Sequence, residues 1–345
     1  MDLSPSLPNA LTWTFVAALA LATATRFWLA LRQMRHVAAH RAAVPAPFSD
    51  AIPLRDHQKA ADYTLVKARF GMLFVFVEAL LALWLTVGGL IQALSDVCGL
   101  WLAPGSLLHG TALLLSIFLV QGLVGLPLTA YRIFVIEERF GFNRMTVGLF
   151  VADLVKQTLV GLVLGVPLLL ALLWLMEQAG AYWWLYAWVV VVAFTLFMQM
   201  LVPTVIMPLF NKFTPLPDGD LKAKVAALLE RTGFRTKGLF VMDGSKRSSH
   251  GNAFFAGFGR AKRIVLFDTL VSRLQPAEVE AVLAHELGHY KLHHIVKGML
   301  ITSAMGFVML PVLGPVLDGP WFYRGLGVQD QSAAAALALL LIVLS

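Results

Sequence analysis

The sequence predicts a mainly α-helical membrane protein: a bundle of seven transmembrane helices, the seventh cut short, with a small α+β cytosolic subdomain. Composition is the first observation behind this prediction, because 59% of the 345 residues are hydrophobic and only 14% are charged, against about 25% in soluble domains. The second is a series of apolar runs of the roughly 20 residues that a helix needs to cross a bilayer. The third is one long polar segment, residues 211–297, between two of those runs.

Six runs are long enough to span a bilayer, and a seventh is not. The predicted spans are Ala10–Leu31, Phe70–Leu94, His109–Phe134, Val147–Met176, Tyr182–Phe210 and Gly298–Leu317. The seventh run starts near Ser332 and stops at Ser345, so we expect the natural protein to continue. The first run is interpreted as a retained span and not a signal peptide, because its first basic residue is Arg26 and its apolar stretch is longer than about 15 residues.

Basic residues orient the spans, because Lys and Arg accumulate on the cytoplasmic side. Residues 32–69 hold seven of them and residues 211–297 hold fourteen, whereas the loop 95–108 holds none and the loop 318–330 holds only Arg324. This alternation predicts an N-terminus outside and the polar segment in the cytoplasm of an integral multi-pass protein, in a bacterial inner membrane or an ER-type membrane. The formal charge of +7 is explained by this topology, so no nucleic-acid partner is expected.

The predicted domains follow from these spans. They are residues 1–210 with five transmembrane helices and a cytosolic loop at 32–69, residues 211–297 as the cytosolic subdomain, and residues 298–345 with the sixth helix and the start of the seventh. At under 90 residues, the subdomain must lean on the membrane helices for much of its core.

Inside the polar segment, the pattern predicts helix, strand, loop, strand, strand and helix. A helical pattern covers Asp220–Arg231 and closes at Gly233, and strand patterns cover Gly238–Met242 and Arg263–Phe267. Between the two strands, Asp243–Gly259 is turn-rich at first and then aromatic.

The last predicted helix of the segment carries the sequence His285-Glu286-Leu-Gly-His289, an H-E-x-x-H pattern. Positions i and i+4 lie on one face of a helix, so both imidazoles can bind one Zn²⁺ per chain at about 2.0–2.1 Å. Glu286 can accept a proton from the attacking water, as the general base of a metalloprotease does. Pro276 and Glu278 suit the first turn of a helix.

A third zinc ligand is expected, because catalytic zinc usually has three protein ligands. The only carboxylates after His289 are Asp318 and Asp330, which the topology puts in the outer loop. His293 lies about 12 Å along a straight helix from His285. His293 and the neighbouring His294 are therefore predicted to lie at the membrane interface or behind the ligands.

Three ionisable residues, Glu78, Asp153 and Lys156, fall at membrane depth. Such residues usually face a bundle interior or a water-filled cavity. Asp153 and Lys156 are three positions apart, so we predict that they pair on one helix face. No inverted repeat is evident, which disfavours a transporter.

Four further stretches, taken with the H-E-x-x-H pattern, resemble the integral-membrane zinc CAAX prenyl proteases of type I, the a-factor-converting endopeptidases, in a bacterial-type form. These stretches are Ile136–Asn143, Pro208–Phe213, Asp243–Gly259 and Arg263–Leu270. The resemblance implies seven helices around a chamber, with the zinc site near its cytosolic end. It also implies removal of the C-terminal tripeptide that follows a prenylated cysteine.

The resemblance assigns site residues as well. The zinc ligands would be His285 and His289, with a glutamate from a later helix expected beyond Ser345. Asn252 would contact the substrate, and Ala253 and Phe254 would begin a strand that pairs with an extended peptide. The residues alone favour a turn role for Asn252.

The expected partners are a peptide or protein substrate, prenylated or not, and the lipid bilayer. A broader membrane-protein quality-control protease fits the same motifs. A catalytically silent membrane scaffold is the alternative from another class, and the intact H-E-x-x-H pattern argues against it.

Overall fold

The computed structural model describes residues 6–234, 236–256 and 263–343, and these are mainly helical, as predicted. Within them, six helical segments are long and apolar enough to cross a membrane, and they match the six predicted spans: Leu7–Ala39, Leu54–Leu85, Leu107–Glu137, Val147–Gln178, Gly180–Phe210 and His294–Leu317. The seventh run forms α13 (Ala333–Val343), an apolar helix of 11 residues.

The helices differ from the predicted spans at their ends. Helix α1 (Ser6–Ala39) and helix α2 (Leu54–Leu85) both extend into the segment 32–69, which was predicted as a loop. The helices are longer than the predicted spans because an apolar run indicates only the part of a helix that contacts lipid. Polar residues continue both helices beyond that part. The predicted second span is also interrupted, since α3 (Leu90–Gly99) is separate and follows Gly89, whose φ of 75° is accessible to glycine.

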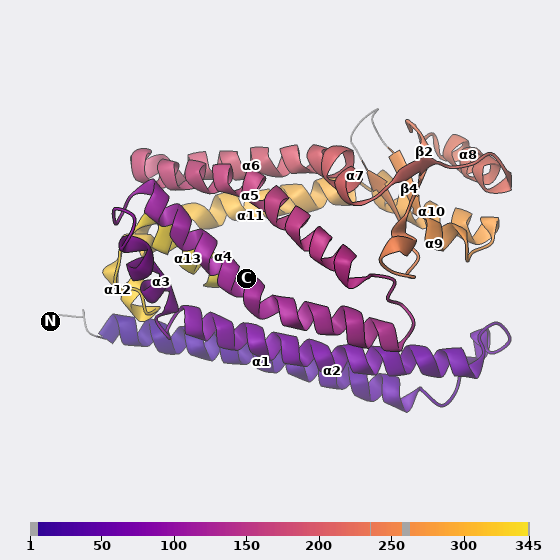
Figure 1. Cartoon of the computed structure of the whole chain (residues 1–345), viewed down its shortest axis with the longest axis horizontal. Helices are drawn as coiled ribbons and strands as arrows, with labels where there is room; N and C mark the ends of the chain where they lie inside the picture. The colour runs from indigo at the N-terminus through magenta and orange to yellow at the C-terminus, as the bar shows by residue number, and fades with distance from the viewer. Residues whose placement is uncertain (1–5, 235, 257–262, 344–345) are drawn as a thin grey trace. The chain divides into compact units, whose positions relative to one another are not determined.

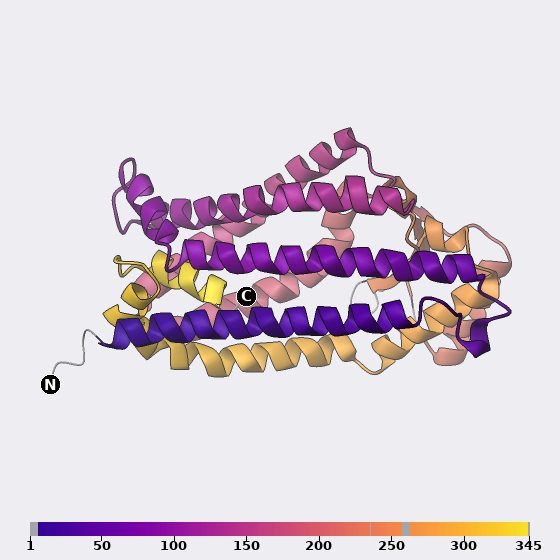
Figure 2. The same cartoon turned by 90° about the horizontal axis from the view of Figure 1, so that it is seen from below.

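The chain forms two compact units, Met1–Phe140 with Leu169–Gly180 and Val312–Ser345, and Gly141–Leu168 with Ala181–Pro311. In the first unit, α1 and α2 run side by side (Figures 1 and 2). The short helix α3 packs on α4 (Leu107–Tyr131). Apolar side chains such as Ile91 and Leu113 are fully buried in this unit. Others, such as Trp13 and Leu21, are exposed, as is expected of a surface that contacts lipid.

The second unit holds a four-stranded sheet in the order β1-β2-β4-β3. Its strands are β1 (Phe213–Pro215), β2 (Leu239–Met242), β3 (Ala253–Ala256) and β4 (Arg263–Phe267). Strands β2 and β4 are parallel, and the other two pairs are antiparallel. The two strand patterns and the strand that begins at Ala253 are confirmed. Strand β1 was not predicted, because Pro215 argues against a strand; its place at the sheet edge is where proline is tolerated.

Two helices pack on one face of this sheet, α8 (Asp220–Thr232) and α10 (Pro276–Lys291) (Figure 1). Their shared core is formed by Leu216, Val225, Leu228, Leu229, Ala253, Ile264, Leu266, Leu270, Val279, Leu283 and Leu287. Helix α8 closes at Gly233, as predicted, and this glycine adopts the left-handed conformation. Each fully buried Val or Leu side chain contributes about 1.5–3 kcal/mol to folding, so this core fixes α10 on the sheet. The rest of the second unit includes α5 (Val147–Gln178), up to residue 168, and α6 (Trp183–Leu201) followed by α7 (Met207–Phe210).

Candidate active site

Helix α10 starts where the sequence predicts. Pro276 occupies its first turn, and Gln275 and Glu278 form a reciprocal capping box, in which the Gln275 N–H donates to the Glu278 carboxylate at 2.7 Å. Val279 and Leu283 are fully buried against the sheet, with Leu287 one turn further on. Because this spacing defines one face of the helix, the two motif histidines fall on its exposed side.

His285 and His289 direct the same ring nitrogen toward each other. The distance between their Nε2 atoms is 3.2 Å, and their ring centroids are 4.9 Å apart. Two Zn–N bonds of about 2.0–2.1 Å at a tetrahedral angle would place the nitrogens roughly 3.3 Å apart. The pair therefore fits zinc as two of its ligands. No group of three His, Cys, Asp or Glu side chains that could hold a metal occurs among the described residues, and the glutamate expected beyond Ser345 stays a prediction.

Glu286 follows His285 on the same turn of α10, and its side chain is half-buried. It stands at the position of the H-E-x-x-H pattern that carries the base in metalloproteases. Its role as general base stays a prediction.

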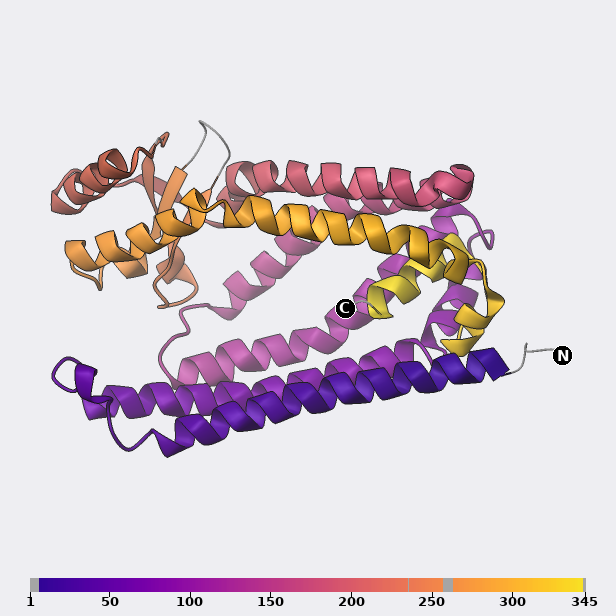
Figure 3. The same ribbon diagram turned by 180° about the vertical axis from the view of Figure 1, so that it is seen from behind.

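The chain breaks its helical path directly after the motif. Helix α10 ends at Lys291, His293 adopts a φ of 56°, and α11 (His294–Leu317) follows directly. The break between the two helices can be followed in Figure 3. The Nδ1 atoms of His294 and His289 are 2.9 Å apart. A place behind the ligands was one of the two positions predicted for His293 and His294, whereas the left-handed turn at His293 was not predicted.

Strand β3 forms one edge of the sheet as described, and its first residues are the predicted substrate contacts. The side-chain oxygen of Asn252 accepts a hydrogen bond from the Ala253 N–H at 2.8 Å, and its backbone carbonyl accepts one from the Phe267 N–H at 2.9 Å. Both bonds are local structural contacts of Asn252, and its role toward a substrate stays a prediction. The Ala253 side chain is buried in the core, and Phe254 is partly buried, edge-on to Phe267. The predicted continuation of the strand to Phe258 lies outside the described residues.

A cavity of about 500 Å³ joins β3 to the histidine motif. Phe254 and Phe255 line it from the strand, and His289 and His294 line it from the helices, together with apolar residues of α6 such as Phe194. Neither His285, Glu286 nor Asn252 lines it. The structure thus brings one predicted ligand and one predicted substrate residue to a common apolar space.

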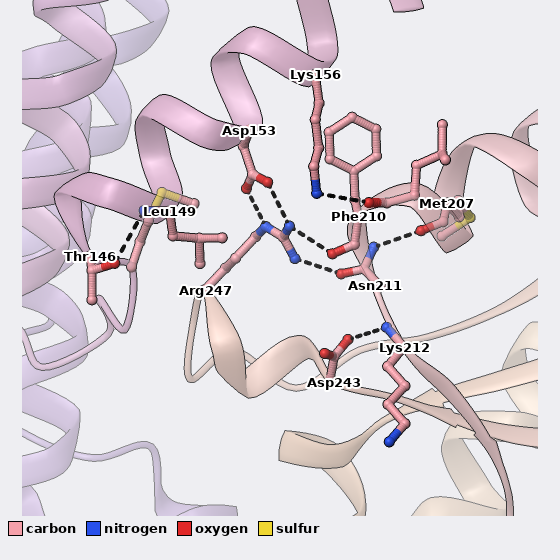
Figure 4. Close-up of polar contacts among 12 residues, drawn as sticks. Thr146, Leu149, Asp153, Lys156, Met207, Phe210, Asn211, Lys212, Asp243 and Arg247 are labelled. Atoms are coloured by element: carbon pink, nitrogen blue, oxygen red, sulfur yellow. Dashed lines mark hydrogen bonds and ion pairs between the residues drawn. The ribbon is translucent and has the colours of Figure 1, made fainter.

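The loop before β3 is anchored by Arg247, which was not among the predicted site residues (Figure 4). Its guanidinium donates to both carboxylate oxygens of Asp153, at 2.6 and 2.9 Å, to the Asn211 side-chain oxygen at 2.7 Å and to the Phe210 carbonyl at 2.8 Å. The predicted pairing of Asp153 with Lys156 is therefore wrong. A guanidinium offers a planar pair of donors that matches a carboxylate, whereas an ammonium does not. Lys156 instead donates to the Leu209 carbonyl at 3.1 Å.

Three of the sequence motifs meet around this arginine. Asn143 forms an isolated bridge with Ser248, and the Ser249 N–H donates to the Phe142 carbonyl at 3.0 Å. Phe210 and Asn211 come from the Pro208–Phe213 stretch. The signals that could have predicted this cluster were a single arginine in a turn-rich stretch and an aspartate at membrane depth.

The similarity to known proteins covers nearly the whole chain. Residues 33–212 match the family described as "CAAX prenyl protease N-terminal, five membrane helices", and residues 215–343 match "Peptidase family M48". The CAAX prenyl protease 1 homologue of Arabidopsis thaliana is 34% identical, over 90% of this chain and 75% of its own length. That of Caenorhabditis elegans is 33% identical, over 94% and 79%. The crystal structure of Ste24p from S. mikatae superposes with a TM-score of 0.86 at 29% identity, covering 97% of this chain and 81% of the other.

Proposed function

The chain belongs to the CAAX prenyl protease family of M48 zinc metallopeptidases, and from that premise we propose that it removes the C-terminal tripeptide that follows a prenylated cysteine. The observation that carries the proposal is the 3.2 Å separation of the His285 and His289 Nε2 atoms, beside a cavity that an edge strand lines. The bacterial-type assignment stays a prediction, and the relatives named above are eukaryotic.

In the proposed mechanism, His285 and His289 would hold one Zn²⁺, which would polarise the scissile carbonyl and lower the pKa of water so that it can lose a proton near neutral pH. Glu286 accepts the proton of the attacking water. The same carboxyl group then donates that proton to the leaving amine, so the base is regenerated without a further group. Proton transfer of this kind contributes about 10²–10⁴-fold to a rate.

The substrate peptide is proposed to bind as an added strand on β3. Backbone hydrogen bonds would give affinity, and side-chain pockets would give selectivity. Three observations support this binding mode: β3 pairs only with β4 among the described strands, Asn252 stands at its start, and Phe254 and Phe255 lead from it to the cavity of His289. Because that cavity is mainly apolar, it suits an aliphatic or aromatic side chain of the substrate better than a charged one.

The zinc site is proposed to face the cytoplasm. Fourteen of the 27 basic residues lie in the segment 211–297, whereas the preceding loop at 177–181 has none, and positive residues mark the cytoplasmic side. In this arrangement residues 211–297 act as the catalytic subdomain, between the spans of residues 1–210 and 298–345.

Cleavage of matched peptides by the full-length protein tests the function. The peptides share one sequence that ends in cysteine and three residues, and one carries a farnesyl group on the cysteine whereas the other does not. The proposal expects release of the tripeptide from the farnesylated peptide at a much higher kcat/KM. Equal cleavage of both peptides, and of unrelated unfolded membrane segments, would favour a broader quality-control protease. No cleavage by a zinc-loaded protein would favour the silent scaffold.

A further inference from the structure

The turn between α10 and α11 places a third imidazole behind the zinc-ligand pair. His293 is the one residue other than glycine with positive φ in the described chain, at 56°. This conformation is disfavoured for residues with a Cβ atom, so the contacts around it must hold it. On a continuous helix, five residues advance the chain by about 140° around the axis, and His294 would then lie on a different face from His289. The break at His293 instead brings their Nδ1 atoms to 2.9 Å.

Zinc binding at His289 would select one of the two donor–acceptor arrangements that this contact allows. A hydrogen bond between two imidazole nitrogens needs one N–H and one lone pair. The Nε2 atom of His289 points toward Nε2 of His285, so its lone pair must be kept for the metal and its proton must sit on Nδ1. With zinc bound, His289 would therefore donate from Nδ1 to Nδ1 of His294, and His294 would carry its own proton on Nε2. A second partner on the far ring nitrogen is what fixes the orientation and basicity of a metal-binding histidine.

We propose that His294 is the positioning residue for the zinc ligand His289, an inference that rests on the proposed zinc-peptidase function. By accepting the Nδ1 proton, it holds the ring with Nε2 turned to His285 and strengthens that nitrogen as a donor to zinc. His294 does not serve as a ligand in this geometry, because it faces the nitrogen of His289 on the side away from His285.

Zinc affinity tests the proposal without a peptidase assay. The full-length protein, stripped of metal in detergent, is titrated with zinc in competition with a fluorescent chelator, for wild type and three variants. His294→Leu removes the acceptor at similar bulk. His294→Asn places an amide oxygen close to the former Nδ1 position. His293→Asn is the matched control, because it removes the adjacent imidazole and asparagine tolerates positive φ.

We expect His294→Leu to weaken zinc binding about 10- to 100-fold, the usual effect of losing such a partner. His294→Asn should restore most of the zinc affinity, and His293→Asn should leave it unchanged. All metal-free proteins should unfold at the same temperature. Unchanged affinity in His294→Leu would overturn the proposal. So would equal losses in the Leu and Asn variants, because a direct ligand or a packing role would not be rescued by an acceptor. A wild-type protein that binds no zinc would instead contradict the proposed function itself.

Discussion

Arg247 and Asp153 form a two-point ion pair, with donor–acceptor distances of 2.6 and 2.9 Å. Their side chains are only 21% and 6% exposed. The pair joins the first turns of α5 to the loop that leads into β3, and two further bonds from the guanidinium reach Asn211 and Phe210. The position of the proposed substrate strand therefore depends on an aspartate about 100 residues earlier in the sequence.

Replacing Arg247 by Gln should lower the free energy of unfolding by roughly 3–5 kcal/mol, because it leaves the Asp153 carboxylate buried without its charged partner. Thermal unfolding in detergent measures this effect. The control is Lys246→Gln, which removes one exposed positive charge at the neighbouring position. Arg247→Lys should recover only part of the stability, since an ammonium cannot reproduce the two parallel bonds. Equal melting temperatures for the Arg247 and Lys246 variants would show that the pair is not a structural anchor.

The fully buried Leu283 fixes the helix that carries the histidines. Leu283→Ala should destabilise the protein by about 2–5 kcal/mol through lost burial and the cavity left behind. Ala284→Ser, at the next and exposed position, is the control and should have little effect. Urea unfolding of both variants checks the difference, and a Leu283→Ala protein as stable as wild type would contradict the packing described for α10.

Asn252→Ala should weaken kcat/KM while zinc content stays unchanged, because one hydrogen bond to the reacting peptide is worth about 0.5–1.5 kcal/mol. The Asn252 side-chain oxygen also accepts a hydrogen bond from the Ala253 N–H. Asn252→Asp is therefore the companion variant, because it keeps an acceptor for this bond. Steady-state kinetics with the farnesylated peptide measure both. Full activity of Asn252→Ala would remove this residue from substrate binding.

The added-strand binding mode makes a separate prediction about substrates. A proline placed where its N–H would pair with β3 should block cleavage, since proline has no N–H to donate. A proline one residue away, where the N–H points outward, is the control peptide. Efficient cleavage of both peptides would mean that the substrate is held elsewhere.

A cysteine introduced at the exposed Ser245 tests sidedness. In intact cells, a membrane-impermeant thiol reagent should fail to label Ser245→Cys and should label it after permeabilisation. The native Cys98, predicted outside, is replaced by serine in this experiment and serves separately as the outward-facing control. Labelling of the 245 position from outside would reverse the predicted orientation.

Much of the fold was predictable because its signals are local. The apolar runs predicted the six spans. The helix of the histidine motif was predicted from Pro276 and Glu278 in its first turn and from the apolar face that Val279 and Leu283 form. Spacing alone was enough to predict that His285 and His289 converge, because i and i+4 are neighbours on any helix.

The parts that were not predicted depend on tertiary contacts. Asp153 has a basic residue within reach on its own helix, Lys156, yet pairs with Arg247, 94 residues away; no local pattern encodes that choice. The left-handed conformation of His293 was not predictable either. A glycine is the usual local signal for a helix end in this conformation, and the sequence has none there.

Glu286→Gln tests the central claim, that this chain hydrolyses peptides with a zinc-dependent general base. The amide keeps the shape of the carboxylate but cannot accept the proton of water. Zinc content and turnover of the farnesylated peptide are measured on the same full-length preparation. We expect wild-type zinc content with kcat reduced on the order of 10²–10⁴-fold. Near-normal turnover by the zinc-loaded variant would contradict the account.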